Sequence, residues 1–106
     1  MRYKLTWSIQ AAADLLAVWD TVFDLSRDAE TADRYAEELK ETLLALTDHP
    51  KTGFPLIYDG LLTGFYSVNY KAYKAFYRVR EDRVELLRIL PKAADYLRLL
   101  FPEEGT

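Results

Sequence analysis

The stretch NYKAYKAFYRVREDRVELLRIL, residues 69–90, decides the fold predicted for this chain. The runs AYKAFYRVR (72–80) and RVELLRIL (83–90) are rich in aromatic and β-branched residues, as strands are, and only a short charged turn separates them. We therefore predict a β-hairpin whose two faces differ, because successive side chains of a strand point to opposite sides. One face carries Tyr77, Val79, Val84 and Leu86, and the other carries Lys74, Arg78 and Arg80.

The segments next to this hairpin extend the sheet. LIYDG (56–60) and GFYSVNY (64–70) have strand composition and short turns between them, which indicates an antiparallel meander of three or four strands. Downstream, a short helix is predicted from about residue 93 to residue 100. At the other end of the chain, YKLTW (3–7) alternates apolar and polar residues and is a further strand.

Two amphipathic helices are predicted between the first strand and the meander. Ser8 is a candidate N-cap of the first helix, and Asp28 of the second. The second helix ends before Pro50, because proline cannot continue a helix. Apolar residues spaced by three and four define the buried stripes, and Asp14, Asp20 and Asp24 are expected to face water. The stripes are Ala12, Leu15, Leu16, Trp19, Val22 and Phe23 in the first helix, and Ala32, Tyr35, Ala36, Leu39, Leu43 and Leu46 in the second.

This order of elements predicts an α+β fold in which two helices cover one face of an antiparallel sheet. The 106 residues, half of them hydrophobic, suit one domain spanning 1–106. The chain has no cysteine and one histidine, His49, so we expect neither a metal site nor a cofactor. It also lacks a membrane-length apolar run and the pattern of a secretory signal, so a cytoplasmic location is expected.

Charge is distributed unevenly along the chain. Residues 1–65 contain 6 basic and 11 acidic side chains, a net charge of −5, whereas residues 66–100 contain 8 and 4, a net charge of +4. The last six residues add −2, which brings the chain to −3. A basic sheet face opposite acidic helices is typical of an anion-binding surface. The alternative is a solvated face with no ligand.

Three motifs, in this order and spacing, make the chain similar to the RelE/ParE superfamily of bacterial toxins. The resemblance extends from Tyr3 to about Phe101 and implies the strand, helical hairpin and antiparallel sheet predicted above. The motifs are a helix ending in Leu46-x-x-x-Pro50-x-x-Gly53, a strand with Tyr73-x-x-Phe76-Tyr77-Arg78-Val79, and the sequence Leu87-Arg88-Ile89-Leu90.

The resemblance implies the toxin of a type II toxin–antitoxin system, as used in plasmid stabilisation, held inactive by a cognate antitoxin. RelE-like members cleave mRNA in the ribosomal A site without a metal, and ParE-like members poison DNA gyrase. Direct binding to DNA is expected only through the antitoxin. A third alternative is a relative that has lost toxicity and only binds its antitoxin.

The sequence departs from the RelE-like pattern at two places. Tyr66 stands where the family often has arginine, and Pro91 and Ala94 replace the histidine and arginine of Leu-His-x-x-Arg-Asp. Proline can neither transfer a proton nor donate a backbone hydrogen bond. A nuclease would then need other cations and proton carriers. The candidate catalytic residues are Arg78, Arg88, Lys92 and Tyr96, and the candidate target-binding residues are Tyr66, Lys71, Lys74 and Arg80.

Each candidate has a structural alternative. Tyrosines in strands commonly pack across the sheet, and Arg88 could pair with a carboxylate on a neighbouring strand or helix. The gyrase-directed interpretation fits the missing residues better, because a poison that acts by binding needs a surface and no catalytic set. The weakly acidic chain also lacks the strong positive charge that favours a ribosomal target.

Overall fold

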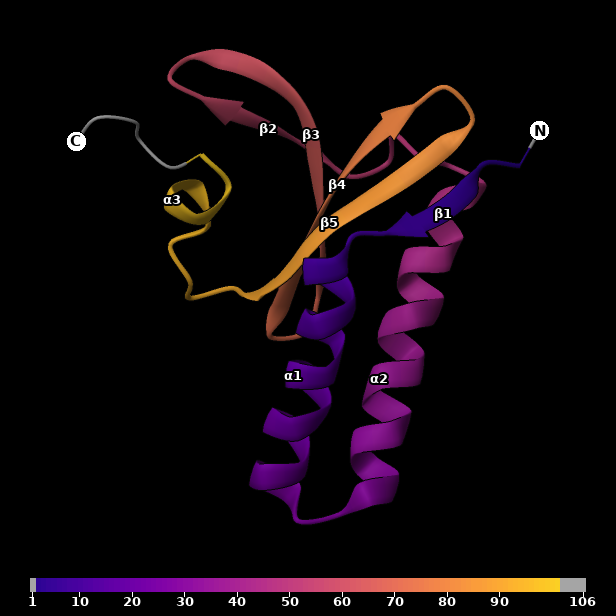
Figure 1. Cartoon of the computed structure of the whole chain (residues 1–106), viewed down its shortest axis with the longest axis vertical. Helices are drawn as coiled ribbons and strands as arrows, with labels where there is room; N and C mark the ends of the chain where they lie inside the picture. Colours follow the sequence, from indigo (N-terminus) through magenta and orange to yellow (C-terminus); the bar gives the residue numbers. More distant parts are fainter. Residues whose placement is uncertain (1, 102–106) are drawn as a thin grey trace.

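The computed structural model of this chain describes residues 2–101. Figure 1 shows a twisted sheet with a long helical hairpin on one side and a short helix near the C-terminus. The strands are β1 (Lys4–Trp7), β2 (Phe54–Tyr58), β3 (Leu61–Tyr70), β4 (Tyr73–Arg80) and β5 (Arg83–Pro91). The helices are α1 (Ile9–Ser26), α2 (Ala29–Leu44), the 3₁₀ turn η1 (Ala45–Thr47) and α3 (Tyr96–Leu100).

The sheet has the strand order β1-β5-β4-β3-β2. Strands β2 to β5 form the antiparallel meander that the sequence predicts, and the α+β fold is confirmed. The N-terminal strand adds a fifth member, because β1 pairs in parallel with β5. Lys4 lies opposite Arg83, and Thr6 lies opposite Glu85.

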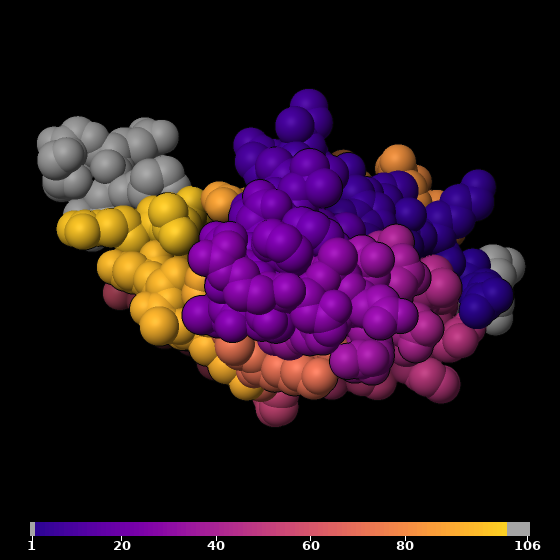
Figure 2. Space-filling view, turned by 90° about the horizontal axis from the view of Figure 1, so that it is seen from below, coloured from indigo at the N-terminus to yellow at the C-terminus, as the bar shows by residue number. Residues whose placement is uncertain are grey.

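Both faces of the sheet are covered, but by different helices. On the inner face, α1 and α2 pack against a core that includes Tyr77, Val84 and Leu86. On the outer face, residues of α3 pack against a smaller core around Phe76. Phe76 and Tyr77 are neighbours in the chain and both have 0% exposure, because each points into a different core. Viewed from below, α3 lies to one side of the helical hairpin (Figure 2).

The buried face of α1 is rotated from the predicted one. Ala11 and Val18 are buried, whereas Leu16 of the predicted stripe is 69% exposed. Asp14, predicted to face water, binds Arg88. The rotation arises because α1 follows β1 directly: the Ser8 Oγ accepts a hydrogen bond from the Ala11 N–H (2.9 Å) and donates one to the Leu87 carbonyl (2.7 Å). This anchor fixes how α1 sits on β5.

The other helices follow the sequence closely. The Asp28 side chain caps α2 as predicted, although the regular helix ends at Leu44 and η1 completes it. The C-terminal helix starts at Tyr96, three residues later than predicted, with Asp95 as its cap. None of the helices within residues 2–101 has the length and hydrophobicity needed to cross a membrane.

Candidate functional site

Basic residues of the sheet and of the segments beside it form two groups rather than one continuous face. One group, here called the arginine group, consists of Lys4, Arg78, Arg80 and Arg83 and lies near the β4–β5 turn. The other, the lysine group, consists of Lys71, Lys74 and Lys92 and lies near the β3–β4 turn, at the opposite end of β4. The outer-face core around Phe76 lies between them.

Strand pairing builds the arginine group around one carboxylate. Arg83 lies directly opposite both Lys4 on β1 and Arg80 on β4, and Glu85 lies opposite Arg78. The Arg78 Nε donates to the Glu85 Oε1 at 2.6 Å, and the Arg80 Nη1 is 4.0 Å from the same oxygen. The Arg78 hydrogen bond, helped by the charges of the neighbouring arginines, lowers the pKa of Glu85 below its ordinary value.

This lowered pKa predicts an acid-dependent loss of stability. Because the pKa of Glu85 is lower in the folded chain than in the unfolded chain, its ionised form stabilises the fold. The contribution is complete above the unfolded pKa of about 4.3 and disappears as the pH falls through the folded value. Unfolding titrations from neutral pH downward should therefore show that Glu85→Gln destabilises the protein at neutral pH and that the difference closes in acid. A difference that stays constant with pH would contradict the ion pair.

The lysine group is mixed with aromatic residues. The Lys74 Nζ lies 4.9 Å from the centre of the Tyr96 ring, which packs on Phe76 with 5.0 Å between the ring centres. Lys92 is exposed, and its backbone N–H donates to the Ala72 carbonyl at 2.9 Å, beside the start of β4. Lys74, Lys92 and Tyr96 therefore lie at the same end of the sheet.

Lys71 is part of a contact between the β3–β4 turn and α2. Its Nζ lies 5.1 Å from the centre of the Tyr35 ring and 3.5 Å from the Glu38 Oε2. The same carboxylate accepts a hydrogen bond from the Tyr70 hydroxyl at 2.8 Å. This bond is the main cause of the lowered pKa of Glu38, and burial, followed by the same bond, raises the pKa of Tyr70.

Arg88 is held by a carboxylate from α1. Its Nε and Nη2 donate to the two oxygens of Asp14 at 2.8 and 3.1 Å, a bidentate pair. The bond raises the pKa of Arg88 above its ordinary value. Asp14 also accepts the Ile89 backbone N–H at 2.9 Å, at the edge of β5 where β1 has already ended. The structure thus places Arg88 in the contact between α1 and the sheet.

The predicted catalytic residues are spread over the sheet. Lys92 lies beside Ala72, and Arg78 is six residues further along the chain, about 20 Å in a strand. Tyr66, a predicted binding residue, packs on Tyr77 on the inner face, with 5.6 Å between ring centres. The assignment of the predicted residues to catalysis or to target binding stays a prediction.

Sequence reasoning missed Lys4 and Arg83 as members of a basic surface. Lys4 is far from the basic half of the chain in sequence, and only the parallel pairing of β1 with β5 brings the two cations together. The alternation of YKLTW placed Lys4 on the solvent side of its strand, which was the one available signal.

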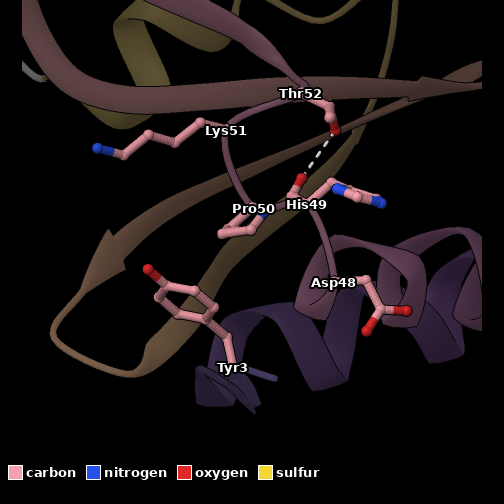
Figure 3. A pocket seen from close by; sticks show the side chains of 6 residues that line it. All are labelled: Tyr3, Asp48, His49, Pro50, Lys51 and Thr52. Atoms are coloured by element: carbon pink, nitrogen blue, oxygen red, sulfur yellow. Dashed lines mark hydrogen bonds between the residues drawn. The ribbon is translucent and has the colours of Figure 1, made fainter. Parts of the chain in front are cut away.

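A shallow pocket of about 470 Å³ lies at the loop that follows η1, and none of the residues of the arginine and lysine groups lines it (Figure 3). It is lined by Tyr3, Asp48, His49, Pro50, Lys51 and Thr52, and the Thr52 hydroxyl donates to the His49 carbonyl at 2.9 Å. Within the described part of the chain, no group of His, Cys, Asp or Glu has the arrangement of a metal site.

Comparison with known proteins links this sequence to one protein family. Residues 5–96 match the model of a family described as the ParE toxin of the parDE type II toxin–antitoxin system. Among curated proteins, none matches this chain at a significant level.

Three solved structures illustrate the likeness. The chromosomal ParDE system from P. aeruginosa has a TM-score of 0.72 and 24% identity, covering 85% of this chain and 96% of that one. The RelBE2 toxin–antitoxin complex from Mycobacterium tuberculosis has a TM-score of 0.65 and 20% identity, covering 89% and 95%. A mutant of E. coli toxin RelE in the free state has a TM-score of 0.63 and 17% identity, covering 93% of each chain.

Proposed function

Because this chain belongs to the family of ParE toxins of type II toxin–antitoxin systems, we propose that it inhibits bacterial growth by binding DNA gyrase. Its regulator is a cognate antitoxin that covers the toxin until it is removed. In this proposal the chain acts by binding, and no residue has to transfer a proton or attack a phosphate.

The observation that supports a binding mechanism is the position of Arg88. A metal-independent nuclease needs fixed cations and a proton carrier close to one phosphate. Arg88 uses one edge of its guanidinium, Nε and Nη2, to bind Asp14, which holds it against α1, and Arg78 is paired with Glu85 about 20 Å from Lys92. Tyr96 packs on Phe76 in the outer-face core. This arrangement disfavours a single catalytic centre made from the four predicted residues.

Pulse labelling of DNA and protein synthesis tests the proposal directly. After induction of this chain alone in a bacterial culture, we expect DNA synthesis to fall before protein synthesis. The matched control is the same culture with the antitoxin gene induced together with the toxin, which should restore both rates. An earlier fall in protein synthesis would contradict the gyrase target.

Cleavage of mRNA on the ribosome is the second candidate, and the lysine group is the observation that favours it. Lys74, Lys92 and Tyr96 bring two cations and a phenol to one end of the sheet. If protein synthesis falls first, Lys92→Ala should relieve growth inhibition without changing stability, because the Lys92 side chain is exposed. If neither rate falls, the chain is a non-toxic relative that only binds its antitoxin.

Exposed apolar residues indicate where an antitoxin can dock. Most of the large apolar side chains left in solvent lie on α1 and on the β2–β3 hairpin, with Leu44 on α2 and Leu99 on α3 in addition, and exposed apolar surface commonly marks protein interfaces. We expect the antitoxin to cover these apolar surfaces and the basic residues beside them. The exposed residues are Ile9, Leu16 and Leu25 on α1, and Phe54, Ile57, Leu61 and Leu62 on the hairpin.

A further inference from the structure

We propose that the arginine group is a separate binding site for an extended acidic segment of a partner protein. Lys4, Arg83 and Arg80 stand side by side on three adjacent strands, with Arg83 directly opposite each of the other two. Arg78 lies on the same face, next to Glu85. The site is distinct from the lysine group, and its test requires no toxic activity.

A row of like charges is unfavourable for the fold. Like charges directly opposite each other across strands are destabilising by a few tenths of a kcal/mol to about 1 kcal/mol. Within residues 2–101, neither Lys4 nor Arg83 has an ion-pair partner within 4.0 Å, and Glu85 already binds Arg78. Glu81 and Asp82, in the turn between β4 and β5, form no ion pair with Lys4, Arg80 or Arg83. Glu85 offsets only part of this repulsion, because one carboxylate is shared by Arg78 and Arg80. An arrangement that breaks a local rule with incomplete compensation is expected at a functional position.

The contact between Arg78 and Glu85 indicates that this surface suits carboxylates. The Arg78 guanidinium binds the Glu85 carboxylate at 2.6 Å through Nε, and its other N–H groups stay available. Arginine binds carboxylates with matching planar geometry, so further carboxylates suit the same surface. Because β1 is an edge strand, an extended peptide can lie beside Lys4 and direct alternate side chains toward the row.

Nucleic acid fits this surface less well. The aromatic residue opposite Arg78 is Phe65 on β3, and it packs on Phe101 in the outer-face core with 5.7 Å between ring centres, so its ring is already occupied and is a poor platform for a base. Residues 9–44 of the helical hairpin contain 9 acidic and 3 basic side chains, and the whole chain has a net charge of −3. This balance opposes a phosphate backbone, whose binding depends on extensive charge neutralisation. A protein segment with a few carboxylates requires only the local cations.

Fluorescence anisotropy with the full chain tests the proposal. The probe is a fluorescein-labelled peptide that alternates Glu and Thr, and a peptide that alternates Gln and Thr is its neutral counterpart. We expect the acidic peptide alone to bind, with an affinity that falls as salt rises. The double variant Lys4→Glu with Arg83→Glu should weaken binding by about tenfold or more. Glu85→Gln should strengthen it, because the internal carboxylate no longer competes.

Charge reversal elsewhere supplies the matched control. Lys51→Glu with Arg98→Glu changes the net charge by the same amount, and both residues are exposed and outside the arginine and lysine groups. This variant should keep the affinity of the unmodified chain. Equal losses in both double variants would overturn the site, because they would show only a response to net charge. Tighter binding of duplex DNA than of the peptide, lost in the Lys4/Arg83 variant, would overturn the peptide as ligand.

Thermal unfolding is a second test, because a purely structural Arg83 and a binding Arg83 predict opposite changes in the melting temperature. Arg83→Thr removes the central cation and keeps a residue suited to a strand, so the melting temperature should rise by about 2–4 °C while peptide binding is lost. A lower melting temperature would show that Arg83 serves the fold, and the argument from unfavourable like charges would fail.

Discussion

Replacing Asp14 with alanine will lower the free energy of unfolding by about 3 kcal/mol, which is a large part of the stability of a small domain. The side chain of Asp14 is 15% exposed and that of Arg88 28%, so the change leaves a largely buried guanidinium without its carboxylate. It also removes the acceptor of the Ile89 backbone N–H at the edge of β5. Denaturant titration of the purified chain measures the loss.

Two further variants test whether the loss in Asp14→Ala comes from its pair with Arg88 or would follow any loss of a carboxylate on α1. Asp20→Ala changes an exposed carboxylate on the same helix and should cost no more than about 0.5 kcal/mol. Adding Arg88→Met to Asp14→Ala should recover part of the loss, since the unpaired charge is removed. If Asp14→Ala is no more damaging than Asp20→Ala, the bidentate pair does not hold α1 to the sheet.

Gly53→Ala will destabilise the fold by about 2–3 kcal/mol, although the change adds only one methyl group. A Cβ at this position would lie 2.4 Å from the Tyr77 hydroxyl oxygen and 2.6 Å from the Ser67 carbonyl oxygen. Tyr77 has 0% exposure, and its hydroxyl accepts a hydrogen bond from the Gly53 N–H at 3.1 Å, so it has little room to move. Thermal and chemical unfolding both report the effect.

A substitution elsewhere in the same loop and a double variant control for this effect. Lys51→Ala lies in the same loop on an exposed residue and should change stability by about 0.5 kcal/mol at most. In a Tyr77→Phe background, Gly53→Ala should cost less, because the closest atom, the hydroxyl oxygen, is gone, whereas the Ser67 carbonyl oxygen at 2.6 Å and the ring carbon Cε1 at 3.1 Å remain. Strictly additive losses would show that the hydroxyl does not limit the space at residue 53.

The sequence determined the elements and their order because these depend on local patterns. Alternation and turn residues in residues 69–90 specify the β4–β5 hairpin whatever surrounds it, since side chains of a strand face opposite sides by geometry. Ser8 and Asp28 cap α1 and α2 as predicted, because capping involves only neighbouring backbone groups. The same local rules placed Lys74, Arg78 and Arg80 opposite the inner core.

The tertiary structure alone decided which charges meet. Parallel pairing of β1 with β5 joins Lys4 to Arg83 across 79 positions of the sequence, and no local rule selects that neighbour. The rotation of α1 turned Asp14 from a predicted surface residue into the partner of Arg88. Packing of α3 over Phe76 divided one predicted basic face into the arginine and lysine groups. These contacts join residues distant in sequence, so they depend on how whole elements pack, and periodicity within one element contains no information about that.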